Sequence, residues 1–495
     1  MVKSNDNLEK LVRSAGKNEV IRAVNALPFF PSGIDIRKTK HLPALPYLYY
    51  VSRVLQDVKR VYQSQTHKTL SDIKEMSPTT KIPSDYFDNS RYIHSLIGTL
   101  AHGFSNGFQY NQKPSNEFDP NLSEQDYKIN PTFVPYGLVL ALAGIETVIS
   151  MSETLDDVFD NSEERRGKET YHYTHGWKAA TLSSDLQLID SLEIVDGISS
   201  YYIRKVIREA AKTTAKGQGL EIDIQRRLAA KGIELRTDSR GMSDEDSEKF
   251  IAELMRKLKG DREKSSRMKT SALIECAADC GTFYGGLKPQ DLLKKAIMRY
   301  SREFGIMHQI RNDLDDVQSG RAEDMRDGVL NLVVFGALSN PDMAFDDKLT
   351  LASTLTRQYD RIKARAILPG DVIHRANPRP TRRLSKLEEE EEREQAAHET
   401  MFDDDLAEAI RYDEEEDPET SELNFDDGLS GDSHIQAEEA IKLSNQLAHE
   451  YGSEGAWERI NREKEKLTRK VITKISPDPV GQRVLESVVD MIIKE

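Results

Sequence analysis

Helical periodicity is the sequence feature that most restricts how this chain can fold. Apolar residues recur at three- and four-residue spacings through 134–229 and 266–365, and again from 433 to 495. Few segments show the alternation of apolar and polar residues that is typical of strands. Residues 1–133 mix apolar stretches with Pro- and Asn-rich breaks, which indicate loops between helices. The sequence therefore predicts an all-α fold.

Negative charge is concentrated in one internal segment. Between Glu388 and Asp432 there are 21 acidic and two basic residues, whereas the whole chain has 84 acidic and 69 basic residues and a net charge of −15. The rest of the chain is therefore slightly basic. Blocks of like charge with few apolar residues do not offset the entropy lost on ordering, so we predict a disordered basic and acidic insertion at 369–432. The helical core before it covers 134–368, and C-terminal helices follow at 433–495.

Composition excludes several classes of protein. The two cysteines, Cys276 and Cys280, are interpreted as small buried residues in a reducing compartment, and not as half of a metal site. The most apolar stretch, 135–151, contains Glu146 and is too short to span a bilayer comfortably. We therefore expect a cytoplasmic protein. A basic stripe with interleaved aromatic residues is missing, which argues against nucleic-acid binding, while the basic stretch 375–386 allows peripheral contact with a membrane.

One acidic cluster ends an apolar helix. Asp156 and Asp160 are four residues apart and share a helical face, and Asp157 lies beside them. Converging carboxylates suit Mg²⁺, which commonly bridges to substrate phosphates. Arg165 and Arg166 follow, and guanidinium groups match phosphate oxygens. The alternative interpretation is a solvated acidic helix end followed by a basic loop.

A second acidic cluster strengthens the functional interpretation. Asp313 and Asp316 are three residues apart, after an apolar run in another predicted helix. Two such clusters on different helices could hold a metal–diphosphate between them. Lys269 and Gln218 are polar residues in comparable places on two further helices.

In their order along the chain, these segments resemble the motifs of the trans-isoprenyl diphosphate synthase, or polyprenyl synthetase, family. The resemblance is good over 134–335, loose over 433–495 and weak over 1–133. Glu221 stands where the family usually has Asp, and Asn312 stands where the second motif usually begins with Asp. The segments concerned are DDVFDNSEERRGK with His172, LSSDLQL, GQGLEIDI, MKTSALIECAADCGTFYGG and HQIRNDLDDV.

The resemblance implies an isoprenoid-synthase-type helical bundle around a central cavity. Residues 134–368 would form its catalytic core, with divergent N-terminal helices from 1–133 and a completing set from 433–495. It also implies Mg²⁺ as cofactor, an allylic diphosphate and isopentenyl diphosphate as substrates, and a homodimer. The implied reaction is prenyl transfer by ionisation, condensation and elimination, without a protein nucleophile.

The resemblance also assigns roles to individual residues. Met151 and Ser152 would floor the pocket of the growing chain, which indicates a C15–C25 product. The implied metal ligands are Asp156, Asp157, Asp160, Asp313 and Asp316; the implied catalytic residues are Lys269, Arg165 and Arg166; and further substrate contacts are Thr270, Gln218 and Gln309.

Departures from the family pattern leave alternatives open. The GKxxRP element has no clean counterpart, and the nearest candidates are Arg37, Lys38 and Lys40. Ile149 stands where His or Gln usually helps to hold isopentenyl diphosphate, and Val329 replaces a phosphate-contacting lysine. These changes favour a terpene synthase or a prenyltransferase with a non-standard acceptor as the second hypothesis. A non-catalytic regulatory subunit of a heteromeric synthase is the third.

Overall fold

The computed structural model describes residues 45–76, 92–107, 134–160, 162, 164–165, 168–238, 244–320, 322–366 and 431–494. Contacts divide the chain into one compact unit of 1–361 with 438–495, and a second unit of 362–437. Of the second unit, the structure describes only the end of one helix and the start of another. The predicted insertion at 369–432 therefore lies almost entirely outside the described residues, as do Arg37, Lys38 and Lys40.

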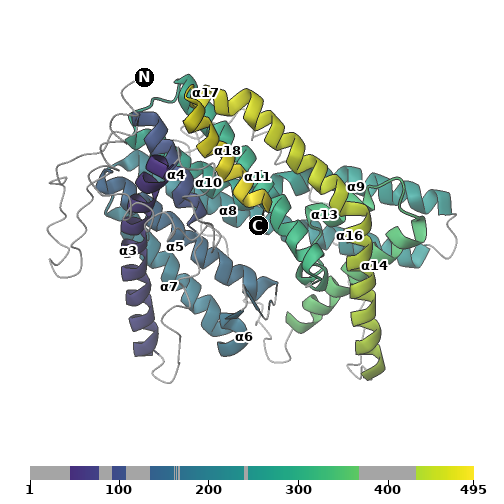
Figure 1. Ribbon diagram of the computed structural model, residues 1–495. Helices are drawn as coiled ribbons and strands as arrows, with labels where there is room; N and C mark the ends of the chain where they lie inside the picture. Colours follow the sequence, from purple (N-terminus) through teal and green to yellow (C-terminus); the bar gives the residue numbers. More distant parts are fainter. Residues whose placement is uncertain are drawn as a thin grey trace, which may run out of the picture. The chain divides into compact units, whose positions relative to one another are not determined.

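The first half of the described chain is a series of helices interrupted by one small hairpin (Figure 1). In the hairpin, the two short strands pair antiparallel, with Arg165 opposite Lys168. The elements are α3 (Leu45–Met76), α4 (Ile93–Asn106), α5 (Tyr136–Phe159), β1 (Glu164–Arg165), β2 (Lys168–Glu169), α6 (Tyr171–His175), α7 (Trp177–Asp196) and α8 (Tyr201–Asp238).

The second half contains helices only, two of which include a π-helical turn. α9, η3 and α10 follow one another without a break, and so do α16, η5 and α17. The elements are α9 (Asp244–Ser266), η3 (Arg267–Ser271), α10 (Ala272–Tyr284), α11 (Leu292–Ser319), α12 (Glu323–Arg326), α13 (Leu332–Leu338), α14 (Phe345–Ala366), α16 (Gly431–Leu467), η5 (Thr468–Ile472), α17 (Thr473–Ile475) and α18 (Pro479–Lys494).

The prediction of an all-α fold is confirmed for the described residues, in which the hairpin is the only sheet. The helical pattern extends further than the periodicity of 134–229 indicates. α8 continues to Asp238, and α9 buries Ile251 and Leu258. The many charged residues of α9 lie around a buried apolar stripe, which the composition of the segment conceals.

Two apolar cores lie in the larger unit. The first is built from α3, α4, α5, α10 and the first part of α11, together with the C-terminal helices. The second is built from α9, α13, α14, α16 and the last part of α11. α8, the continuous α9–η3–α10 helix and α11 contribute apolar side chains to both cores. The polar middle sections of these three helices therefore meet where one core ends and the other begins.

α5 is the described helix that is long and apolar enough to cross a membrane, but 67% of its most apolar window is buried inside the protein. Its one central charge, Glu146, is fully buried and accepts hydrogen bonds from the backbone N–H of Ser95 at 3.0 Å and from its hydroxyl at 2.6 Å. Because buried carboxylates need such donors, the pattern is that of a core helix.

Candidate active site

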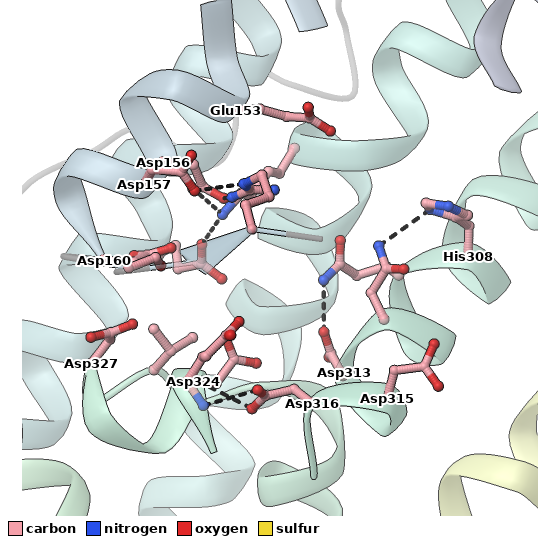
Figure 2. Close-up of a pocket in the computed structure, with 18 of the residues that line it drawn as sticks. Glu153, Asp156, Asp157, Asp160, His308, Asp313, Asp315, Asp316, Asp324 and Asp327 are labelled. Atoms are coloured by element: carbon pink, nitrogen blue, oxygen red, sulfur yellow. Dashed lines mark hydrogen bonds and ion pairs between the residues drawn. The ribbon is translucent and has the colours of Figure 1, made fainter. Parts of the chain in front are cut away.

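A cavity of about 590 Å³ lies between the end of α5, the middle of α8, η3 and the end of α11. Twelve carboxylate side chains line it, against three from Lys or Arg, so the cavity has a large excess of acidic groups. Figure 2 shows Asp156, Asp157 and Asp160 on one wall and Asp313 and Asp316 on the opposite wall. The two aspartate motifs therefore face one cavity from different helices.

The first wall consists of the last turn of α5 and the hairpin that follows it. Arg165 on β1 turns back toward α5, where its Nε lies 2.5 Å from Asp157 Oδ1 and its Nη2 lies 3.7 Å from Asp156 Oδ2. The hairpin is fixed to the helix by the backbone N–H of Ser162, which donates to Asp157 O at 3.0 Å. These contacts hold one guanidinium group at the edge of the cavity.

Lys269 enters the cavity from the π-helical turn η3. Its Nζ lies 2.8 Å from Asp156 Oδ1 and 2.7 Å from Glu221 Oε2. Two glycines allow η3 to come this close to its neighbours. A Cβ atom at Gly217 of α8 would lie 2.7 Å from the backbone N of Lys269, and one at Gly305 of α11 would lie 2.7 Å from Ser271 Cα. Close packing on both sides therefore fixes the backbone of Lys269, and π-helical turns are frequent at functional sites.

The second wall is held mainly by the backbone. Asp313 Oδ2 accepts from the N–H of Leu332 at 2.7 Å, and its Oδ1 accepts from Gln309 Nε2 at 2.7 Å. Asp316 accepts from the backbone N–H groups of Glu323 at 2.9 Å and Asp324 at 3.2 Å, at the start of α12. Both aspartates thus serve the local fold as well as facing the cavity.

Alternating charges connect the two walls. Lys269 joins Asp156 to Glu221, and Arg262 of α9 joins Glu221 to the second wall through Asp313 Oδ2, 3.7 Å from its Nη2. In order, the chain of ion pairs runs through Asp157, Arg165, Asp156, Lys269, Glu221, Arg262 and Asp313.

Burial, and to a smaller extent the charge of neighbouring carboxylates, raises the pKa of several acidic side chains in the cavity. Burial raises the pKa of Asp157 to about 6, and the charge of Arg165 offsets this only in part. Burial, reinforced by the charge of Asp156, raises the pKa of Asp160 well above its usual value. Burial and the nearby charge of Asp316 do the same to Asp324. Burial is the largest cause of each shift, and a neighbouring carboxylate adds to it.

In the middle of this series of ion pairs, neighbouring charges outweigh the effect of burial on the pKa values. Burial alone would raise the pKa of Glu221, but Lys269 and Arg262 outweigh it and hold the pKa at about 2. Burial likewise opposes the charge of Lys269, yet Asp156 and Glu221 raise the pKa of its ammonium group well above the usual value. These groups are therefore ionised at neutral pH.

The donor set fits a hard divalent cation such as Mg²⁺. Oxygen atoms dominate the lining, and the unneutralised carboxylates favour added positive charge. Among the residues that the structure describes, no three metal-binding side chains already lie together as a ready-made site. Lys269 and Arg165 instead contact the carboxylates of the first wall, and these contacts must rearrange when a metal binds.

The structure brings most of the predicted site residues together. All five predicted metal ligands, together with Arg165, Lys269 and Gln309, line the cavity. Thr270 donates its hydroxyl hydrogen bond to Gln309 Oε1, behind the lining. Arg166 lies outside the described residues.

Besides Thr270, three predicted substrate contacts do not line this cavity. Gln218 is half-buried on α8, Met151 packs against the first core, and the hydroxyl of Ser152 donates to Val148 O at 2.9 Å. Their predicted roles remain predictions.

Sequence reasoning missed several lining residues. Arg262 was overlooked within a highly charged segment, although it lies seven residues, or two helical turns, before Lys269 and therefore on the same face. Glu153 has a similar signal, because it lies one turn before Asp157 on α5. Asp324 and Asp327 carry no such signal, since they follow a turn whose path only the fold determines.

Comparison with known proteins gives a consistent result for the same part of the chain. The profile of the polyprenyl synthetase family matches residues 139–364. A short chain isoprenyl diphosphate synthase of Methanocaldococcus jannaschii is 23% identical over 213 residues, which cover 41% of this chain and 56% of that protein. The chloroplastic geranylgeranyl pyrophosphate synthase 9 of Arabidopsis thaliana is 30% identical over 193 residues, which cover 37% and 47% of the two chains.

Among solved structures, a geranylgeranyl pyrophosphate synthase of Corynebacterium glutamicum, complexed with isoprenyl diphosphate and magnesium, aligns with a TM-score of 0.49 at 15% identity. The alignment covers 87% of this chain and 97% of that one. The chain spans about half the length of the two relatives described above.

The cavity, with its two aspartate motifs, lies within the matched residues, apart from Tyr92, Ile93 and His94. The profile match over residues 139–364 confirms the resemblance of this part of the chain to the polyprenyl synthetase family.

Proposed function

We propose that this protein is a Mg²⁺-dependent prenyltransferase that joins an allylic diphosphate to isopentenyl diphosphate and releases a longer prenyl diphosphate. The observation that carries the proposal is the pair of aspartate motifs on opposite walls of one cavity, with Lys269 and Arg165 on the first wall. The relatives support it, because the names of both describe prenyl diphosphate synthases.

Carboxylates of both walls would hold the metal. Asp156, Asp157 and Asp160 would bind from α5, and Asp313 and Asp316 from α11. When bound, Mg²⁺ supplies Lewis-acid stabilisation of the negative charge that develops on the departing diphosphate.

The cations of the cavity have a matching task. Lys269 and Arg165 bind diphosphate oxygens once Asp156 and Asp157 are otherwise neutralised, and they stabilise the leaving group as its charge grows. Ile93 and Ile149 provide apolar surface in the same cavity, where an allylic cation is shielded from water. The acceptor double bond attacks this cation, a carbon–carbon bond forms, and loss of a proton restores a double bond.

The direct test is an assay of the full-length protein with Mg²⁺, an allylic diphosphate of one to three isoprene units, and labelled isopentenyl diphosphate. We expect labelled prenyl diphosphates longer than the allylic substrate and no product in the presence of a chelator. A variant with Asp156→Asn and Asp157→Asn serves as the inactive control. Absence of turnover of every allylic substrate would contradict the proposal and favour a regulatory subunit.

One observation favours a second candidate function. Ile149 and Val329 both line the cavity, so two positions that the family usually fills with diphosphate-binding side chains are apolar here. A prenyltransferase with a non-standard acceptor, or a terpene synthase, would ionise the same allylic diphosphate without needing those side chains. Release of diphosphate without incorporation of isopentenyl diphosphate in the same assay would favour this candidate.

We further propose that the protein acts as a homodimer. Five large apolar side chains of α7 are more than a third exposed, and spacings of four and seven residues place several of them on one side of the helix. We expect Ile189→Asp to lower the mass measured by light scattering to that of a monomer. Leu443→Asp, on α16, is the matched control and should leave the mass unchanged. The five side chains are Trp177, Leu182, Leu188, Ile189 and Leu192.

A further inference from the structure

Arg262 is the most deeply buried cation of the cavity. Its side chain is only 3% exposed, compared with 23% for Lys269 and 30% for Arg165. A guanidinium group this far from water needs carboxylate partners, and Arg262 has two of them from two different helices. Its Nη1 donates to Glu221 Oε1 on α8, and its Nη2 lies 3.7 Å from Asp313 Oδ2 on α11.

Glu221 links this arginine to the lysine of the cavity. One of its oxygens, Oε1, accepts from Arg262, and the other, Oε2, accepts from Lys269 Nζ at 2.7 Å. Because each oxygen has its own cation, the carboxylate cannot rotate without breaking a contact. The orientation of Lys269 therefore depends on Arg262 through Glu221.

Asp313 is held by two hydrogen-bond donors and one ion-pair partner. Gln309 binds one oxygen and the backbone N–H of Leu332 binds the other, which also faces Arg262. Partners of this kind orient a metal-binding carboxylate, and losing one of them typically weakens metal binding about 10- to 100-fold. Arg262 also connects Asp313 to Glu221 and, through Glu221 and Lys269, to the first wall.

We propose that Arg262 is a positioning residue, which sets the place of Asp313 directly and the place of Lys269 through Glu221. The inference rests on the proposed function, because it assumes that Asp313 binds the metal and Lys269 binds the diphosphate. It goes beyond that function in assigning Arg262 a task that it performs through two other side chains.

The test measures metal binding to the full-length protein without substrate, with Mn²⁺ as the probe and the free ion detected by electron paramagnetic resonance. Arg262→Met removes the charge and keeps the approximate length, and we expect the Kd for Mn²⁺ to rise about 10- to 100-fold. Arg262→Lys keeps the charge but lacks the fork that reaches two carboxylates, so we expect an intermediate Kd. This second variant also carries the test if Arg262→Met does not fold.

The matched control is Lys294→Met. It removes an ion pair outside the cavity, Lys294 Nζ to Asp279 Oδ1 at 2.5 Å, whose side chains are 9% and 14% exposed. We expect its Kd for Mn²⁺ to stay within about twofold of the wild-type value, since none of the cavity contacts changes. An unchanged Kd in Arg262→Met, or a wild-type Kd in Arg262→Lys, would overturn the proposal.

A double variant separates positioning from a general loss of charge. If Arg262 acts through Asp313, then Arg262→Met combined with Asp313→Asn binds Mn²⁺ no more weakly than Asp313→Asn alone. If the fold-changes in Kd from the two substitutions multiply in the double variant, the proposal is overturned. It is also overturned if the wild-type protein binds no Mn²⁺. A different result would refute the proposed function but not the role of Arg262. In that case the Arg262 variants lose Mn²⁺ binding, and the wild-type protein turns over no prenyl diphosphate.

Discussion

The two aspartate motifs face the same cavity but are held in different ways. In the first motif, Asp156 and Asp157 contact the ends of long side chains, Lys269 and Arg165. In the second motif, Asp313 and Asp316 contact backbone N–H groups of the segment that follows α11. Asp156 is 21% exposed at its side chain, whereas Asp313 is 3% exposed.

This difference suggests a division of labour. Ammonium and guanidinium groups can move away when another cation arrives, because their stems have many rotamers. Backbone donors cannot move in this way without changing the fold. The first motif is thus suited to exchanging partners during a reaction cycle, and the second to keeping a constant geometry.

Truncation of one aspartate from each motif gives the largest expected effects. We expect Asp156→Ala and Asp313→Ala each to lower kcat/KM by about 10²–10³, because each removes a charge from the proposed site of the departing diphosphate. Only Asp313→Ala should also lower the free energy of unfolding, by about 1–3 kcal/mol, because it leaves the N–H of Leu332 without its acceptor.

Turnover and thermal melting in the presence of a chelator measure these two effects. Glu253→Gln is the control for both, since Glu253 pairs with Lys257 on the exposed side of α9. Equal melting temperatures for the two alanine variants would contradict the claim that the two motifs are held in different ways.

The loss of Lys269 should affect the stability of the metal-free protein more than that of the metal-bound protein. Lys269→Met is expected to lower kcat/KM about 100-fold, because a cation proposed to bind the diphosphate is missing. Without metal, it also leaves Asp156 and Glu221 without their shared partner. We therefore expect Mg²⁺ to raise the melting temperature of this variant more than that of the wild type. An equal increment in both proteins would contradict the idea that lysine and metal neutralise the same carboxylates.

Metal binding should weaken as the pH falls through 6. Asp157 must lose its proton to bind a metal, and with a pKa of about 6 it is mostly protonated at pH 5 and mostly ionised at pH 7. We expect about tenfold weaker Mg²⁺ binding at pH 5 than at pH 7, measured by calorimetry.

The pH dependence of folding stability without metal is a poorer measure of the protonation of Asp157, because two opposing contributions to stability overlap. The raised pKa of Asp157 favours the folded state at low pH, whereas burial lowers the pKa of His94 to about 3 and of His102 to about 4, which disfavours it below pH 6.5. The control is Asp157→Asn, in which the pH dependence of metal binding should become shallower. An unchanged slope in this variant would assign the dependence to other carboxylates.

The smallest expected effect concerns the cap that Asp316 forms on α12. Asp316→Ala removes the acceptor of two backbone N–H groups and is expected to cost about 1 kcal/mol of stability. Asp316→Asn keeps one acceptor oxygen and should melt closer to the wild type. If both variants melt like the wild type, the backbone contacts of the second motif do not contribute to stability.

The sequence predicted the main features of the cavity because its motifs lie on long helices. Spacings of three and four residues place Asp156, Asp160, Asp313 and Asp316 on defined helical faces, and the structure brings these faces to one cavity. The all-α fold follows from the same periodicity. Which helices surround the cavity was not evident from periodicity and was taken from the family resemblance.

Other predictions depended on details that only the packed structure contains. Gln218 was expected in the site, but Gly217 and Glu221 form the face of α8 that contacts η3. Gln218 follows Gly217 and is therefore turned by about 100° away from that face. Met151 is likewise turned toward the core from the face of α5 that carries Glu153 and Asp156. The partners of Asp316 depend on the path of the chain after Gly320, which has a positive φ of 74°.

The helices that cross from one apolar core to the other have a consequence for how the protein opens. α8, the α9–η3–α10 helix and α11 are each anchored at both ends, and their polar sections between the two cores carry Glu221, Lys269 and Gln309. A segment fixed on both sides cannot fray from an end, so its amide hydrogens exchange only when a whole core comes apart. Slow amide exchange should therefore coincide with the most highly charged part of the molecule, the reverse of the usual distribution in which charged regions exchange first.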